Sequence, residues 1–312
     1  MTLTQLNYIV AVDRCRNFAQ AARECFVTQP TLSMQIQKLE DYLQIVIFDR
    51  QKSPIEPTVM GEKVIEYARK ILSSSQELEE MAKNVRGEVS GEFTLGVIPT
   101  LAPYLLPLFL QRYSEAYPRV QLKIYELQTN EMIQYLQDGK IDAGLLATPL
   151  EVKNLVETVL FYEPFQVYLS PQNILLKNKK IDESDLYDQK AWLLKEGHCL
   201  RAQMMNICQL SQDSEQKIFF EAGSLETLVQ LVKNSVGFTI LPYLCANVLN
   251  EEDKKNLRSM KKTTPVREIS FVTGKQSIKK GIEKSLIKVI KSQLPDELKK
   301  KNSKEEVISI FS

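Results

Sequence analysis

The sequence is poor in the residues on which many enzymes and secreted proteins depend. It has one histidine, His198, and five cysteines in 312 residues. A zinc site or a histidine-assisted nucleophile would therefore have to use His198. The five cysteines are too few and too scattered for a disulfide framework, and in a reducing cytosol they begin as thiols. We predict no bound metal and no cofactor.

The sequence also lacks export and membrane signals and a net charge. No apolar run approaches the roughly 18–20 residues of a membrane helix, and the N-terminus MTLTQLNYIV has no basic region. We therefore expect a cytoplasmic protein with no membrane partner. Forty basic residues against 39 acidic ones give a net charge of +1. Any nucleic-acid binding must then come from a local surface.

Residues 1–60 have the pattern of three short helices and a small β-wing. Apolar residues recur at helical spacing in 3–12, 18–25 and 29–43. Thr28 suits an N-cap, and Pro30 falls in the first turn, where its missing N–H matters little. Alternation in 45–50 and 55–58 predicts the wing. The third helix leaves a set of mostly polar side chains pointing outward: Gln29, Thr31, Ser33, Gln35 and Lys38.

Two helices joined by a short turn, the second polar on its outer face, are typical of a DNA-reading helix-turn-helix. Amide side chains such as Gln29 pair with adenine edges, and hydroxyls such as Thr31 contact bases or phosphates. Arg50 in the wing could hold a phosphate. The alternative is a three-helix bundle with a solvated polar face. Charge does not decide, because residues 1–60 hold six basic and six acidic side chains.

Residues 61–87 predict a dimerising linker helix. Seven residues spaced alternately by 4 and 3 form a heptad seam: Val64, Ala68, Ile71, Ser75, Leu78, Ala82 and Val85. Gly87 follows, where a helix would stop. The alternative is an amphipathic helix packed only on its own domain.

From residue 92 the pattern alternates between strand and helix, which favours βαβ units and a parallel sheet. We expect a domain over 88–312 with two α/β lobes: lobe I over about 91–163 and 268–295, and lobe II over about 164–267. Residues 191–196 (AWLLKE) are expected as a strand. The Lys-rich tail from Asp296 is expected to be frayed. The fold class is therefore α/β and multidomain.

The stretch KEGHCLRAQMMNIC places Cys199 beside His198 and near Arg201, with Cys208 nine residues on. Cationic groups or a helix N-terminus lower a thiol pKa, and a thiolate attacks peroxide to give a sulfenic acid, which a second thiol converts to a disulfide. On an intact helix nine residues part the Cα atoms by about 13–14 Å, whereas a disulfide needs about 4.4–6.8 Å. A bond would require the segment to refold. The alternative is two inert core thiols, which we expect of Cys15, Cys25 and Cys245.

The N-terminal motifs resemble those of LysR-type transcriptional regulators. The resemblance rests on AA(x)5-TQPTLSxQIxKLE, followed by F-x-R and T-x-x-G, and it continues over nearly the whole chain. It implies a winged helix whose helix-turn-helix begins at Phe18 and ends at Gln37, a homodimer through the linker helix, and a homotetramer on double-stranded promoter DNA, with RNA polymerase as a partner. It also implies a two-lobed effector domain like a periplasmic binding protein.

The motifs GHCLR…C, F-x-A-x-SLETL and G-x-T-x-LP resemble the peroxide-sensing branch of that family. The resemblance implies that Cys199 is the peroxidatic thiol and Cys208 the resolving thiol. It also implies that Thr100, Thr129 and Arg267, with His198 beside the thiol, position hydrogen peroxide.

We therefore expect a transcription activator of oxidative-stress defence genes, switched by peroxide, rather than an enzyme. One alternative is a metabolite-responsive regulator that binds a small anion between the lobes through Thr100 and Thr129. Another is a thiol peroxidase, which would consume peroxide catalytically with a thiol reductant. A metabolite sensor has no need of the Cys199–Cys208 pair.

Overall fold

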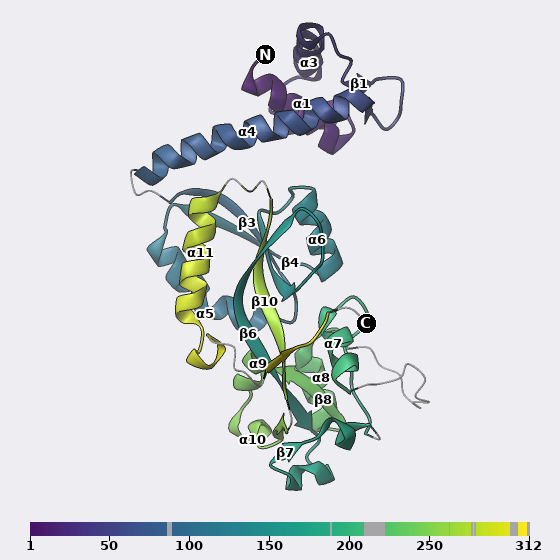
Figure 1. The fold of residues 1–312 in the computed structure, drawn as a ribbon, viewed down its shortest axis with the longest axis vertical. Coiled ribbons are helices and arrows are strands. Elements are labelled where there is room, and N and C mark those ends of the chain that lie inside the picture. Colours follow the sequence, from purple (N-terminus) through teal and green to yellow (C-terminus); the bar gives the residue numbers. More distant parts are fainter. Residues whose placement is uncertain are drawn as a thin grey trace. The chain divides into compact units, whose positions relative to one another are not determined.

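The computed structural model describes residues 1–85, 89–187, 189–208, 222–261, 263–275, 277, 279–299 and 305–310 (Figure 1). The chain divides into two compact units, Met1–Glu88 with Gln276–Lys280, and Val89–Lys275 with Gly281–Ser312. Within the described ranges, no helix is both long enough and apolar enough to cross a membrane.

The N-terminal unit contains the predicted three helices and wing. The helices are α1 (Leu3–Cys15), α2 (Phe18–Glu24) and α3 (Gln29–Leu43), and the wing pairs β1 (Phe48–Asp49) antiparallel with β2 (Glu56–Pro57). Thr28 caps α3 by accepting a hydrogen bond from the Thr31 N–H at 3.4 Å. Asn17 caps α2 in the same way. Apolar faces of all three helices meet in one core.

The long helix α4 (Val59–Val85) begins where Thr58 accepts a hydrogen bond from the Gly61 N–H at 2.9 Å. A Cβ on Gly61 would collide with the Ile47 carbonyl, so only glycine lets the helix cross the wing so closely. Ala68, predicted for the dimer seam, is buried in the core of its own unit, because α4 packs along α1. The seam prediction is therefore wrong for this position.

The outer part of the seam remains uncovered within one chain. Ile71 is 39% exposed and Leu78 is 63% exposed. The side chains of Ala82 and Val85, and the whole of Gly87, lie outside the described residues. The predicted seam positions that are exposed among the described residues are therefore Ile71 and Leu78.

The second unit is built on one nine-stranded sheet. The strands are β3 (Gly91–Val97), β4 (Val120–Glu126), β5 (Ala143–Thr148), β6 (Leu155–Leu169), β7 (Lys180–Ile181), β8 (Phe238–Pro242), β9 (Leu257–Met260), β10 (Thr264–Gly274) and β11 (Glu305–Val307). Their order is β4-β3-β5-β10-β6-β9-β7, with β8 beside β6 and β11 beside β10. The strands β3, β4 and β5 are parallel, but β10 is antiparallel to β5 and β6. The sheet is therefore mixed, not parallel as predicted.

Helices cover this sheet and share one core with it. They are α5 (Ala102–Ala116), α6 (Thr129–Gln137), α7 (Cys199–Cys208), α8 (Leu225–Lys233), α9 (Tyr243–Asn247), α10 (Glu251–Lys254) and α11 (Lys280–Gln293), with short 3-10 turns at Ile174–Lys177, Glu183–Leu186 and Asp296–Leu298. Tyr113 of α5 and Ser285 of α11 share a buried hydrogen bond of 2.8 Å.

Two long strands run through the predicted lobe boundaries. β6 and β10 lie side by side along the unit (Figure 1), and each continues from one lobe into the other. The boundaries proposed at 163/164 and 267/268 therefore fall inside continuous strands. At that crossing Arg267 is the register partner of Glu163.

Two local predictions are wrong. Residues 191–196 form no strand, because Trp192 donates its N–H to Phe238 and Lys195 donates its N–H to Ala222, so their backbone bonds are divided between two neighbours. The tail is not frayed throughout, since β11 pairs with β10 and Ile310 is buried. The strand and the buried Ile310 lie in a short apolar stretch at the end of the tail, which its overall lysine-rich composition did not indicate. Residues 300–304 and 311–312 lie outside the described residues.

Candidate functional site

The two thiols of the predicted pair lie at opposite ends of one helix. Cys199 is the first residue of α7 and is 9% exposed, and Cys208 is its last residue and is buried. Gly197, at φ +91, leads into the helix, and a Cβ there would also collide with Gln128. Nine residues of intact helix separate the Cα atoms by about 13–14 Å, so no disulfide fits this conformation.

Apolar side chains hold α7 against its lobe. Leu200, Met204 and Ile207 are all buried on the inner side of the helix. Burial of each such side chain contributes roughly 1.5–3 kcal/mol. These contacts stabilise α7 as a helix while Cys199 and Cys208 are free thiols.

Burial is the largest influence on the Cys199 thiol, and it raises the pKa. The charge of Arg267, the hydroxyl of Thr129 and the N–H groups of Leu200 and Cys199 lower the pKa in part. The expectation of a thiol with a lowered pKa is therefore not met, because loss of hydration outweighs the helix N-terminus and the nearby cation.

Arg267 reaches this site from β10 with a fully buried guanidinium group. Its Nε and Nη2 lie 2.8 and 2.7 Å from Glu163 Oε2, and its Nη1 donates to Thr100 Oγ1 at 3.0 Å. The other oxygen of Glu163 accepts the Leu244 N–H at 2.8 Å. Sequence reasoning missed Glu163, although an acid between Tyr162 and Pro164 in the mostly apolar second half of β6 was a usable signal.

Two buried polar atoms near this site have no hydrogen-bond partner among the described residues: Thr129 Oγ1 and His198 Nε2. Thr129 nevertheless lies close enough to Cys199 to lower the pKa of that thiol. Burial and the charge of Lys195 lower the pKa of His198, so its ring is neutral near pH 7. Buried polar atoms without partners are unusual and fit a site for a small polar ligand.

The structure thus brings three of the predicted positioning residues to one place. Arg267 and Thr129 act on the Cys199 thiol, and Thr100 is hydrogen-bonded to Arg267. The second thiol, Cys208, lies instead at the other end of α7. Burial, together with Glu183, raises the pKa of Cys208 to about 12. It is a poor nucleophile while α7 is intact.

The other three thiols also have raised pKa values. Burial raises the pKa of Cys245 to about 12 and, less strongly, the pKa values of Cys15 and Cys25.

The second candidate site is the outer face of α3. Gln29, Thr31 and Lys38 are exposed as predicted, whereas Ser33 and Gln35 are half-buried. Pro30 is exposed as well. The amide oxygen of Gln35 accepts a hydrogen bond of 3.2 Å from Gln5 in α1. Gln35 is therefore partly engaged within the domain, because it flanks the core-facing side of the helix.

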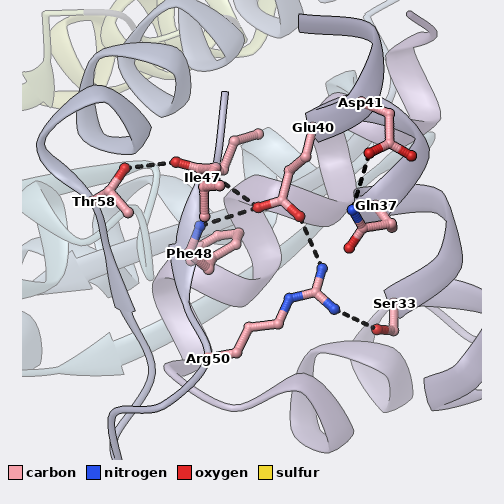
Figure 2. Close-up of polar contacts among 9 residues, drawn as sticks. Ser33, Gln37, Glu40, Asp41, Ile47, Phe48, Arg50 and Thr58 are labelled. Carbon is pink, nitrogen blue, oxygen red and sulfur yellow. Dashed lines mark hydrogen bonds and ion pairs between the residues drawn. The ribbon is translucent and has the colours of Figure 1, made fainter. Parts of the chain in front are cut away.

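Arg50 is held over α3 by a buried carboxylate (Figure 2). Its Nη2 donates to Glu40 Oε2 at 2.9 Å, and its Nη1 lies 3.4 Å from Ser33 Oγ. The other oxygen of Glu40 accepts the Ile47 and Phe48 N–H groups at 2.7 and 3.3 Å. Glu40 thereby links the wing to α3. Sequence reasoning missed it because Glu40 looked like one more surface charge.

Two family models match the chain. Residues 3–62 match the bacterial regulatory helix-turn-helix proteins of the lysR family, and residues 86–294 match the LysR substrate binding domain. The chain belongs to the LysR family. This family consists of transcription regulators and is not an enzyme class.

Relatives of this LysR-family protein cover most of its length. It is 34% identical to the hydrogen peroxide-inducible genes activator of Haemophilus influenzae, over 83% of this chain and 85% of that one. It is 34% identical to the DNA-binding transcriptional dual regulator OxyR of Escherichia coli, over 87% and 89% of the two chains. The full-length C199D variant of OxyR from Pseudomonas aeruginosa superposes with a TM-score of 0.74 at 30% identity, covering 93% of this chain and 98% of that one.

Proposed function

We propose that this LysR-family protein is a transcription activator that senses hydrogen peroxide through Cys199 and Cys208. It acts in the cytoplasm as a homodimer through α4 and as a homotetramer on double-stranded promoter DNA, with RNA polymerase as its partner at oxidative-stress defence genes. The observation that carries the proposal is the placement of two buried thiols at opposite ends of one helix.

The chemistry proceeds in two balanced steps. The Cys199 thiolate attacks one oxygen of peroxide, the O–O bond breaks, and the products are a sulfenic acid and hydroxide, which takes up the thiol proton as water. Cys208 loses its thiol proton and attacks the sulfenic sulfur, the S–O bond breaks, a disulfide forms, and the departing hydroxide takes up that proton as a second water. The two sulfurs together lose two electrons, and peroxide gains two.

Four residues would position peroxide: Thr100, Thr129, His198 and Arg267. The buried Thr129 hydroxyl has no partner of its own and lies at the thiol. Arg267 would favour the thiolate and the developing hydroxide, and Thr100 would orient Arg267. Neutral His198 would supply a hydrogen-bonding ring nitrogen rather than a charge.

The same geometry disfavours the metabolite-sensor alternative. An anion here would gain little from the charge of Arg267, because Arg267 is already paired with Glu163 and both side chains are completely buried. Peroxide is neutral and needs no free charge.

The second step requires α7 to unwind, because the intact helix holds the Cα atoms of Cys199 and Cys208 about 13–14 Å apart. A disulfide would then replace the apolar contacts of the helix with a covalent bond. Such a change would alter the surface of its lobe and so the packing of subunits on DNA. Reduction would restore the helix spontaneously.

DNA reading would divide between two parts of the N-terminal unit. Gln29, Thr31 and Ser33 would reach base edges, with Pro30, Gln35 and Lys38 beside them on the same helix. Arg50 would contact a phosphate from the place where Glu40 holds it.

Three variants, each with one cysteine replaced by serine, test this function in DNA footprinting with and without peroxide. Cys199→Ser should keep the reduced footprint after peroxide, because a hydroxyl forms no sulfenic acid. Cys208→Ser should give a sulfenic acid at Cys199 but no lasting change of footprint. The matched control Cys245→Ser, a buried thiol in the same unit, should respond like the parent protein. A peroxide response that survives in Cys199→Ser would contradict the proposal.

A further inference from the structure

The turn between α2 and α3 presents Phe26 to solvent. Its side chain is 95% exposed, more than any other large hydrophobic side chain among the described residues. Its backbone is left-handed, with φ +56. Bulky residues rarely adopt this conformation, which glycine adopts freely.

Neighbouring hydrogen bonds fix this conformation. The Phe26 N–H donates to Arg23 at 3.1 Å, and the Val27 N–H donates to Ala22 at 3.0 Å. Phe26 therefore occupies the apex of the turn, two residues before the N-cap Thr28. Because only about a twentieth of its surface is covered, the Phe26 side chain adds little packing energy within the domain to offset the left-handed backbone.

Two further apolar side chains nearby in the sequence are also exposed. Pro30 is exposed four residues later, and Met34 is 49% exposed four residues after that. A spacing of 4 places Pro30 and Met34 on one line along α3, opposite the buried residues Leu32 and Ile36. Phe26 lies in the turn that leads into the same end of α3. We term these three exposed apolar side chains, Phe26, Pro30 and Met34, the apolar strip.

We propose that the apolar strip contacts thymine methyl groups in the major groove. The inference rests on the proposed DNA binding. Residues at the N-terminal end of a recognition helix reach base edges, and the thymine C5-methyl is the apolar group that the major groove displays. The strip then gives preference for T·A or A·T pairs at the positions it covers, alongside the polar contacts of Gln29 and Thr31.

The test compares two variants in the full-length reduced protein, Phe26→Ala and Met34→Ala. Its matched control is Tyr42→Ala, which removes an aromatic ring that is 67% exposed near the other end of the same helix. The probe is the duplex that the parent protein selects from a random pool. A set of otherwise identical duplexes then carries uracil in place of one thymine each. Uracil differs from thymine only by the missing methyl group.

We expect Phe26→Ala to weaken binding about tenfold, the size of one specific base-pair contact. The salt dependence should stay the same, because no charge is removed. At one or two positions uracil should weaken the parent protein and leave Phe26→Ala unaffected. Tyr42→Ala should bind like the parent protein. Phe26→Gly should bind weakly yet unfold at the same temperature or higher, because it relieves the backbone.

Other outcomes overturn the inference in distinguishable ways. If the parent protein selects no duplex over random DNA, the proposed function fails and the strip with it. If the parent protein binds but Phe26→Ala binds equally well, only the strip is wrong. Uracil effects that are the same in both proteins would reject the methyl contact. A changed oligomeric mass of Phe26→Ala with unchanged DNA affinity would make the strip a subunit interface, and a lower unfolding temperature of Phe26→Gly would make it structural.

Discussion

Arg267 and Glu163 face each other across strands β10 and β6, and neither side chain has any exposed surface. Their ion pair of 2.7 Å lies where both strands pass from one lobe to the other. Arg267 also carries the positive charge that acts on Cys199. The pair therefore links the sheet crossing to the chemistry of the thiol.

Glu163→Gln should leave the Arg267 charge buried without its counter-charge. We expect the free energy of unfolding to fall by about 3–5 kcal/mol. Oxidation of Cys199 near pH 7 should become faster, because the uncompensated cation lowers the pKa of the thiol. Urea denaturation and the rate of peroxide consumption measure the two effects. Glu268→Gln makes the same charge change one residue from Arg267 and should leave the oxidation rate unaltered.

The oxidation rate of Cys199 should rise with pH. Burial raises the pKa of this thiol above its usual value of 9.0, so below that pH the reactive thiolate is a minor form. Its fraction, and with it the rate, should grow about tenfold per pH unit between roughly pH 6 and 8. Stopped-flow kinetics of Cys208→Ser with peroxide isolate this first step. A rate that is constant over that range would mean a thiol already ionised at pH 6.

The residues that follow β11 should slow the disulfide step. Gln203 and Asn206 of α7 donate to the carbonyls of Ile308 and Ser309 at 3.0 and 3.3 Å. Each bond contributes roughly 0.5–1.5 kcal/mol to the helical form. Gln203→Met, which keeps the volume, should therefore speed disulfide formation severalfold. Sulfenic acid formation at Cys199, measured in the same quenched samples by mass spectrometry, should keep its rate.

The substitution Leu78→Asp should separate α4 from the α4 helix of the second chain in the proposed dimer. An aspartate in an apolar interface has no partner, and its burial is unfavourable by several kcal/mol. Light scattering should show a smaller assembly, and the DNA footprint should shorten. Glu66→Lys changes an exposed charge outside the heptad positions and serves as the control. An unchanged mass for Leu78→Asp would show that the chains associate elsewhere.

Elements set by local sequence were predictable. The Thr28 cap, the apolar period of α3 and the start of α7 after Gly197 all depend on neighbouring residues. The winged helix-turn-helix and the two thiols on one helix followed from such signals.

Features set by contacts distant in sequence were not predictable. Glu163 meets Arg267 only because β6 and β10 pair in one register. Glu40 meets Arg50 only because the wing folds back over α3. The raised pKa of Cys199 depends on how much of the fold covers it, and the tail became a strand because β10 offered an edge.

Disulfide mapping by mass spectrometry, after an equimolar addition of peroxide to the reduced full-length protein, shows whether Cys199 and Cys208 form the switch. We expect one new bond, between Cys199 and Cys208, with Cys15, Cys25 and Cys245 still alkylated as thiols. Once that bond has formed, the amides of α7 should exchange hydrogen faster, because the helix has unwound. A Cys199 that remains a free thiol, or that pairs with any thiol other than Cys208, would rule out the Cys199–Cys208 switch.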